Sequence, residues 1–294
     1  MINRRSFLTG SAAVVASLSL PYKSLSKTVS HVYIAESENI SKAVRHAVEM
    51  AGGITKYIKP GDVVAIKPNM AWARAPEYAA NTNPIVVAEV VKLCFEAKAK
   101  EVYVSDNPCN NARSVYSICQ IPEYAEKSGA NVFIPQNRHY KKMQINGEFV
   151  KEWSVFEMFK VADKVINIPV LKDHGSSKIT ASMKNWLGAV GGFRGALHQN
   201  LHQAIYDLAY FFNPTLNITD CSKVLIKNGP TGGSLSDVKV LNKIVVTTDQ
   251  AAGDAVGAEF LGVDVADIDF LKIAQKKGFG NIRKSNIQIT YEKI

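Results

Sequence analysis

A lysine and a histidine stand two positions apart, directly after a very apolar run of the sequence. The run covers residues 165–171, and Lys172 and His174 follow it. Such a run is typical of a buried strand, and ligands of parallel α/β sheets gather at the carboxyl ends of the strands. A lysine there can bind an anion, and a histidine can transfer a proton or ligate a metal ion. We therefore predict Lys172 and His174 as the catalytic residues of a ligand site, because neither has a simple helix-capping role at this position.

Two further strand ends carry polar residues that could reach the same ligand. Lys67 and Asn69 stand at the end of one expected strand, and Ser105-Asp106 at the end of the next. Residues of these types also form ordinary turns and helix N-caps, so a structural role stays open for each. We include Lys67 and Asn69 among the predicted ligand-binding residues.

A glycine-rich stretch, residues 188–195, follows an expected helix at 180–189 that carries Lys184 and Asn185. Backbone amides of such a loop, together with Lys184 and Arg194, are suited to hold a carboxylate or a phosphate. The glycines have neither the Walker spacing nor the dinucleotide-binding spacing. We predict Lys184 and Asn185 as ligand-binding residues; the alternative is a helix end followed by a mobile lid.

His198 and His202 stand four residues apart on an expected helix at 198–212. This spacing lets two imidazoles bind one divalent metal ion, and His174 could supply a third ligand. No glutamate follows the first histidine, so the pattern is not the His-Glu-x-x-His motif of metalloproteases. Recognition of a phosphate or carboxylate by the same histidines, or no role in a site, remain the alternatives.

Asp249 and Asp254 bracket the start of an expected helix at 251–261. Asp249 is suited to cap that helix, and Asp254 to interact with its dipole. Either carboxylate could instead face the ligand as a base or hydrogen-bond partner of a histidine. Both are therefore kept as candidate ligand-binding residues.

The elements that must position these side chains alternate between short β-rich runs and helical stretches. This alternation predicts an α/β fold, with a mostly parallel sheet or sheets covered by helices. The expected strands are 31–36, 62–67, 101–105, 131–134, 164–170, 216–220, 243–248 and 285–292. The other expected helices are 40–57, 84–97, a segment through 124–127, and 268–276.

Asn146-Gly147 is the strongest short hairpin signal in the chain. The expected hairpin, near residues 142–153, marks the seam between two interlocked lobes at 31–140 and 160–294. A central cleft between such lobes would contain the predicted ligand site.

Composition narrows the ligand class. The net charge is +9, yet the positive residues are spread thinly and form no basic stripe interleaved with aromatic residues. This argues against a nucleic-acid partner and favours attraction of anionic small molecules. The four cysteines form no C-x-x-C pair, which argues against an iron–sulfur cluster held within this chain. A Cys109–Cys119 disulfide is the alternative to free thiols.

The first residues match a twin-arginine export signal. Arg4 and Arg5 are followed by Ser-Phe-Leu and by an apolar run at 12–20. We expect residues 1–26 to be a signal peptide recognised by the twin-arginine translocase, with residues 27–294 working in the periplasm. If the leader is retained, it would anchor the protein to the membrane. This route carries folded proteins, often with a cofactor, and so favours a bound metal or redox group.

These motifs together resemble the bacterial and archaeal family called "domain of unknown function 362". The resemblance spans nearly the whole chain after residue 26 and implies the fold, but the family has no agreed reaction and implies no residue roles. Many relatives carry an attached ferredoxin-type module, whose cysteine runs this chain lacks. The residues that carry the resemblance are Lys67-Pro68-Asn69, Asn83-Pro84, Ser105-Asp106, 165–174, 180–188, Asn228-Gly229-Pro230, Gly232-Gly233, Asp249 and Asp254.

Taken together, the sequence predicts an exported protein that binds an anionic small molecule or cofactor in a cleft, with a divalent metal ion as a further candidate and a role in redox metabolism. The alternative is a non-catalytic accessory or cofactor-delivery protein for a periplasmic respiratory partner. The sequence leaves open whether the protein is an enzyme.

Overall fold

The computed structural model describes residues 29–294. The predicted twin-arginine signal, residues 1–26, lies outside the described residues. Within 29–294, none of the helices has both the length and the apolar character needed to cross a bilayer.

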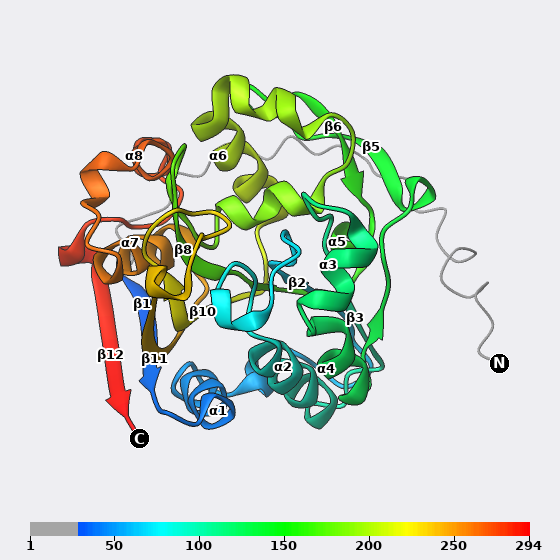
Figure 1. Ribbon diagram of the computed structural model, residues 1–294, viewed down its shortest axis with the longest axis vertical. Coiled ribbons are helices and arrows are strands. Elements are labelled where there is room, and N and C mark those ends of the chain that lie inside the picture. The colour runs from blue at the N-terminus through cyan, green and yellow to red at the C-terminus, as the bar shows by residue number, and fades with distance from the viewer. Residues whose placement is uncertain (1–28) are drawn as a thin grey trace.

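A mixed sheet runs through the middle of the described chain (Figure 1). Four consecutive pairings, β10–β7, β7–β2, β2–β3 and β3–β4, are parallel. The predicted α/β fold with a mostly parallel sheet is therefore confirmed. The strands in spatial order are β12 (Ile287–Lys293), β1 (Ser30–Glu36), β11 (Val238–Thr247), β10 (Leu216–Leu225), β7 (Lys164–Ile168), β2 (Val63–Pro68), β3 (Glu101–Val104) and β4 (Asn131–Val132).

The first strand is held by the last two. β1 pairs antiparallel with β11 and parallel with β12, so both of its neighbours come from the far end of the chain. The single sheet thus contains strands from both of the predicted lobes.

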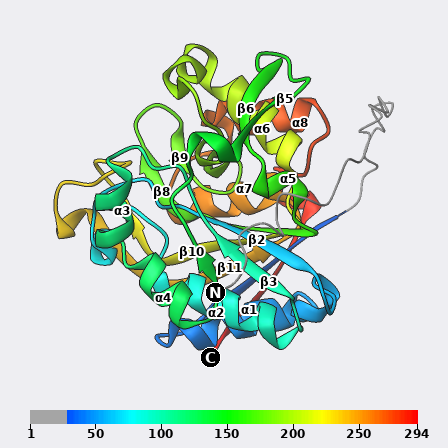
Figure 2. The same ribbon diagram turned by 90° about the vertical axis from the view of Figure 1, so that its right-hand side faces the viewer.

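Helices cover both faces of the sheet (Figure 2). On one face lie α1 (Ile40–Met50), α2 (Pro84–Glu96), α3 (Ala112–Ile118) and α4 (Ile121–Lys127), which share an apolar core with β2 and β3. On the other lie α5 (Met158–Val161), α6 (Leu201–Phe212), α7 (Gln250–Phe260) and α8 (Asp269–Lys276). These form a second core with the two-stranded sheet of β5 (Tyr140–Gln144) and β6 (Glu152–Phe156).

The strand expected at 164–170 divides at Pro169. A proline has no backbone N–H to donate to a sheet ladder, and the chain continues as a separate strand, β8 (Val170–His174), which pairs with the later part of β10. β8 then forms an antiparallel pair with β9 (Lys178–Thr180). This short hairpin carries Lys172 and His174 away from the main ladder.

Three expected helices were wrong in type or extent. The one expected at 198–212 begins at Leu201. The helix expected at 180–189 is instead the end of β9 followed by a 3₁₀ helix at Lys184–Ala189. The β-branched residues Ile179 and Thr180 pair with β8, which removes the first turn of that helix. The helix expected at 40–57 ends at Met50, because Gly52 has a φ of 102°.

Candidate functional site

A pocket of about 550 Å³ opens at the carboxyl ends of β2, β3 and β8. This is the place at which the topology of a parallel sheet concentrates ligands. Its lining residues come from these strand ends, from β9, from the 184–198 segment and from a loop after β10. They are Lys67, Asn69, Ala71, Trp72, Asp106, Asn107, Cys109, Lys172, His174, Thr180, Lys184, Asn185, Leu187, Gly188, Gly192, Phe193, Arg194, Gly195, His198 and Pro230.

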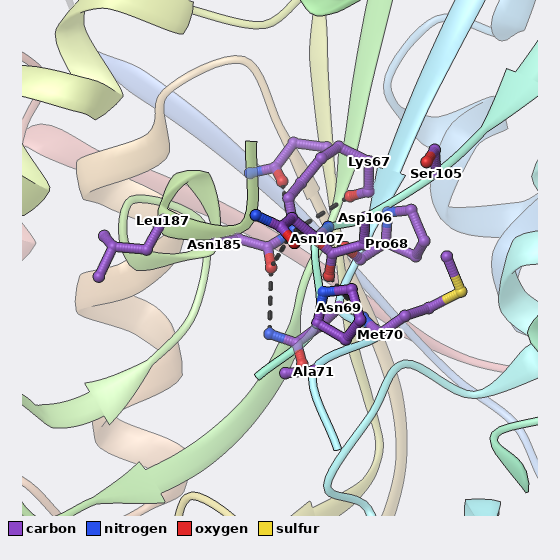
Figure 3. A network of polar contacts seen from close by, with 12 residues as sticks. Lys67, Pro68, Asn69, Met70, Ala71, Ser105, Asp106, Asn107, Asn185 and Leu187 are labelled. Atoms are coloured by element: carbon purple, nitrogen blue, oxygen red, sulfur yellow. Dashed lines mark hydrogen bonds and ion pairs between the residues drawn. The ribbon is translucent and has the colours of Figure 1, made fainter. Parts of the chain in front are cut away.

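An ion pair between Lys67 and Asp106 forms the floor of the pocket (Figure 3). Both residues are buried, and Lys67 Nζ lies 2.7 Å from Asp106 Oδ1. Burial lowers the pKa of Lys67, while the neighbouring Asp106 carboxylate acts in the opposite direction. Asp106 also accepts the backbone N–H of Met70 at 2.7 Å. Lys67 and Asp106 therefore satisfy each other, and this lysine is not a free cation.

Three asparagine side chains connect the Lys67–Asp106 ion pair to the 3₁₀ helix at 184–189 and to β7. Asn185 Oδ1 accepts from Lys67 Nζ and from Asn69 Nδ2, each at 3.1 Å. Asn185 Nδ2 donates to Asn167 Oδ1 at 2.8 Å. Since all of these side chains are buried, the network fixes the 184–189 helix against the ends of β2 and β7.

Lys172 and Thr180 lie opposite each other on the β8–β9 hairpin. Lys172 is 1% exposed, and its Nζ donates to the carbonyl of Ala80 and, at 3.4 Å, to Asn69 Oδ1. Burial, and after it the charge of Lys184, lower the pKa of Lys172 to about 7. The Thr180 hydroxyl is buried and has no hydrogen-bond partner. An unpaired buried hydroxyl is costly, and a bound ligand would satisfy it.

His174 and Lys184 contact each other across the pocket. Their Nε2 and Nζ atoms lie 2.9 Å apart. Burial, followed by the charges of Lys184, Lys172 and His198, lowers the pKa of His174 to about 3. Burial likewise lowers the pKa of Lys184 to about 8. The pocket therefore disfavours further positive charge on these two residues.

Arg194 connects the glycine-rich loop to the residues that follow β3 on the opposite side of the pocket opening. Its guanidinium donates to the carbonyls of Asn107 at 2.8 Å, Pro108 at 2.6 Å and Leu187 at 3.2 Å. The preceding Phe193 is 80% exposed.

All four cysteines are free thiols, and the exposed Cys109 is among the residues that line the pocket.

Seven of the predicted site residues line this pocket, and three do not. Asp249 caps α7 by accepting the N–H of Ala252 at 3.0 Å. Asp254 is fully buried and accepts the N–H groups of Ser182 at 2.6 Å and Met183 at 3.0 Å. The residues that line the pocket are Lys67, Asn69, Lys172, His174, Lys184, Asn185 and His198.

The two histidines of the predicted metal pair belong to different elements. His198 is in a 3₁₀ helix, Arg194–Asn200, and faces the pocket, whereas His202 is in α6. His202 stacks on Phe270 and lies 3.8 Å from the Asp269 carboxylate. Across residues 29–294, no group of three or more His, Cys, Asp or Glu side chains is placed to hold a metal ion.

Two contributors to the pocket were not selected from the sequence. Asp106 was noted as a strand-end residue, but its pairing with Lys67 was not expected. Thr180 was placed in a helix, where its position opposite Lys172 could not be seen. The strand propensity of Ile179-Thr180 was the signal that could have found it.

Comparison with known proteins identifies the family of this chain and does not assign it a reaction. A thylakoid-associated protein of Synechocystis sp. is 28% identical over 274 residues, covering 87% of this chain and 80% of that protein. The lactate racemase apoprotein from Thermoanaerobacterium thermosaccharolyticum aligns with 12% identity and a TM-score of 0.49, over 83% of this chain. A Thermotoga maritima protein aligns with 11% identity and a TM-score of 0.42, over 76% of this chain.

The chain spans 58% of the length of each of these two solved structures. The family match extends over residues 64–259, and this range includes every residue that lines the pocket. On the strength of that match, the chain belongs to the family described as Domain of unknown function (DUF362).

Proposed function

We propose that this protein binds a small anionic molecule, with a carboxylate or phosphate group, in the pocket at the ends of β2, β3 and β8. The observation that carries the proposal is the charge of the lining. Lys67, Lys172, Lys184 and Arg194 line the pocket, and among the described residues Asp106 is the one carboxylate that joins them. That carboxylate already forms an ion pair with Lys67. Lys172 and Lys184 are left without a carboxylate partner within the described chain.

The energetics of buried charge favour an anionic ligand. Removing an ammonium group from water without a counter-charge costs several kcal/mol, which is why the pKa values of Lys172 and Lys184 are lowered. An anion about 4 Å from such a group recovers about 4 kcal/mol at an effective dielectric constant of about 20. The unpaired Thr180 hydroxyl adds a donor for an anionic oxygen.

Isothermal titration calorimetry with sulfate and with inorganic phosphate at pH 7 tests this proposal. We expect both anions to bind, and the Lys172→Met and Lys184→Met variants each to lose about tenfold or more in affinity. Lys160→Met is the matched control. Lys160 also has a pKa lowered by desolvation, but its side chain is exposed, packs on the Phe211 ring and is not among the pocket-lining residues.

Equal affinity in wild type and both pocket variants contradicts the proposal, as does the absence of binding by the wild type. Thermal denaturation of each variant shows whether a loss of binding comes from unfolding. A variant that keeps its melting temperature and loses the anion supports the assignment.

One observation favours a second candidate, a non-catalytic accessory or cofactor-delivery protein for a periplasmic complex. The 80% exposed Phe193 stands beside the mouth of the pocket, where an aromatic side chain is suited to contact another protein. Phe193→Ser distinguishes the two candidates. It removes no charged group from the pocket lining, so in either case sulfate affinity should fall much less than in Lys172→Met. It should weaken co-purification of a partner under the second candidate alone.

A further inference from the structure

The hydrogen bonds of His174 determine which of its ring nitrogens carries a proton. The backbone N–H of Ser176 donates to His174 Nδ1 at 3.1 Å. A backbone N–H has no lone pair to offer and can only donate, so Nδ1 is unprotonated. The proton of the neutral imidazole is therefore on Nε2, the nitrogen that lies 2.9 Å from Lys184 Nζ.

This tautomer fixes the form of Lys184. An Nε2–H group can bond to Lys184 only if Nζ has a lone pair, and therefore only if the side chain is the neutral amine. A Lys184 ammonium would need Nε2 as an acceptor, which would leave both ring nitrogens unprotonated and the ring an imidazolate. Without a bound anion, the arrangement of Ser176, His174 and Lys184 is satisfied by a neutral lysine alone. An anion binds the protonated form, in which the hydrogen bond to His174 is broken.

The surroundings of Lys184 agree with this form. No carboxylate within the described chain pairs with it, and the pocket also contains the cationic side chains of Lys172, Lys67 and Arg194 together with the imidazole of His198. The one carboxylate of the lining, Asp106, is bonded to Lys67. Burial lowers the pKa of Lys184 to about 8, so a fraction of the side chain is the neutral, nucleophilic amine at neutral pH.

We propose that Lys184 attacks the carbonyl group of an anionic oxo acid bound in the pocket and forms an imine with it. The inference rests on the proposed function, since the acid group of the ligand is held by the cationic lining. It names the substrate class, a carboxylate or phosphate compound that also has an aldehyde or ketone.

The step balances without a further reactant. The Nζ lone pair forms a bond to the carbonyl carbon, and the carbonyl oxygen becomes the hydroxyl of a carbinolamine. The C–O bond then breaks as the C=N bond forms. The two protons of the amine leave with the oxygen as one molecule of water.

Neighbouring side chains have distinct roles in this step. Lys172, which lines the same pocket, donates a proton to the departing hydroxyl and takes up the second proton of the amine in return. The Thr180 hydroxyl donates a hydrogen bond to the carbonyl oxygen. His174 is a positioning residue, because its Nε2–H holds the Nζ lone pair and keeps the amine unprotonated until the carbonyl carbon takes the place of that hydrogen bond.

Reductive trapping tests the assignment. The full chain is incubated with glyoxylate and sodium cyanoborohydride, and the modified lysine is located by mass spectrometry of tryptic peptides. Glycolaldehyde is the matched control reagent, because it has the same two carbons and an aldehyde but no carboxylate. We expect one reduced glyoxylate unit on Lys184, little labelling of that residue by glycolaldehyde, and full labelling in the Lys160→Met control.

Two variants separate a chemical role from a structural one. Lys184→Arg supplies a permanent cation but no nucleophilic amine, so it should bind sulfate and lose the adduct. His174→Gln offers a carbonyl oxygen that stabilises a Lys184 ammonium, so the pH midpoint of trapping should move upward. A purely structural role of His174 would leave that midpoint unchanged in the folded fraction.

The outcomes distinguish the two proposals. Sulfate binding without a glyoxylate adduct on Lys184 overturns the imine and leaves the anion site standing. An adduct on Lys172 in place of Lys184 overturns the assignment of the nucleophile. Failure of both sulfate binding and trapping in the folded wild type overturns both proposals.

Discussion

Gly188 lies against the carboxylate of Asp106, and a Cβ at this position would stand 2.0 Å from Asp106 Oδ1 and 2.8 Å from Lys67 Nζ. A real Cβ cannot approach that closely, so a side chain at residue 188 must displace the Asp106 carboxylate and the Lys67 amine from their present positions. The backbone that carries Lys184 can therefore reach the pocket floor only with glycine at this place.

The Gly188→Ala variant should be less stable by at least about 1–3 kcal/mol, the usual cost of overpacking a filled interior. It should also bind sulfate less well, because the pair it displaces forms the floor of the pocket. Chemical denaturation and calorimetry measure the two effects. Gly175→Ala is the control, since nothing lies within 4 Å of its Cβ position, and its stability should stay within about 0.5 kcal/mol of wild type.

The stability losses from removing Lys67 and Asp106 should not add. Asp106→Asn leaves the buried Lys67 without a counter-charge, and we expect a loss of about 3–5 kcal/mol in unfolding free energy. The Lys67→Met/Asp106→Asn double variant should lose less than the sum of the two single variants. Glu123→Gln, which breaks the exposed pair with Lys127, should cost less than about 1 kcal/mol. Additive losses at Lys67 and Asp106 would contradict this account of the floor.

Affinity for sulfate should fall as the pH rises from about 6 to about 9, since sulfate keeps its charge over this range while the lysines lose theirs. Burial lowers the pKa of Lys172 to about 7 and that of Lys184 to about 8, so the protonated, anion-binding forms disappear in this window. Calorimetry at several pH values measures the decline. The Lys172→Met variant should lack the lower of the two steps, and a flat profile in the wild type would count against the assignment.

Without a ligand, the unfolding free energy should rise between pH 7 and about 8.5. Lys172 and Lys184 have folded pKa values of about 7 and about 8, below the ordinary 10.5. The unfolded chain therefore holds protons that the folded protein releases, which gives a positive slope. Below pH 7 the buried Asp254 carboxyl, with its pKa raised to about 7, acts in the opposite direction.

Urea denaturation across this pH range measures the slope. A Lys172→Met/Lys184→Met variant should show a smaller rise between pH 7 and about 8.5 than the wild type. An equal slope in the two proteins would mean that other groups control the pH dependence.

Export by the twin-arginine route is tested with Arg4→Lys/Arg5→Lys. We expect the wild type in the periplasmic fraction and the variant in the cytoplasm, because the translocase recognises the arginine pair. Immunoblotting of the two fractions measures the distribution. A variant that reaches the periplasm as well as the wild type would favour a general secretory signal.

The parts of the site that could be predicted from sequence are those that follow from strand position. Lys67 and Lys172 were selected because they end expected strands, and the structure brings both to one pocket. The sequence could not show which hydrogen-bond or ion-pair partner each of these polar side chains has. Asp249 and Asp254 have the residue type of a site carboxylate, yet their oxygens are used by backbone N–H groups.

The fold was predictable where local preference and tertiary pairing agree, as in α2 and β2. It was not predictable at residues 180–189, where pairing with β8 decides the structure of Thr180. His198 and His202 show the same limit, because a break between a 3₁₀ helix and α6 separates residues that one continuous helix would align.

The pairing of β1 with β11 and β12 has a consequence for the order of synthesis. β1 directly follows the proposed leader, yet both of its sheet neighbours are translated last. A nascent or truncated chain that stops before Val238 has no place to dock its first strand, and the open edges of β1 and β10 are then available to chaperones or to other chains. A chain must therefore be translated through β12 before the fold is finished. If the proposed twin-arginine route carries this protein, the strand order would restrict that route to complete chains.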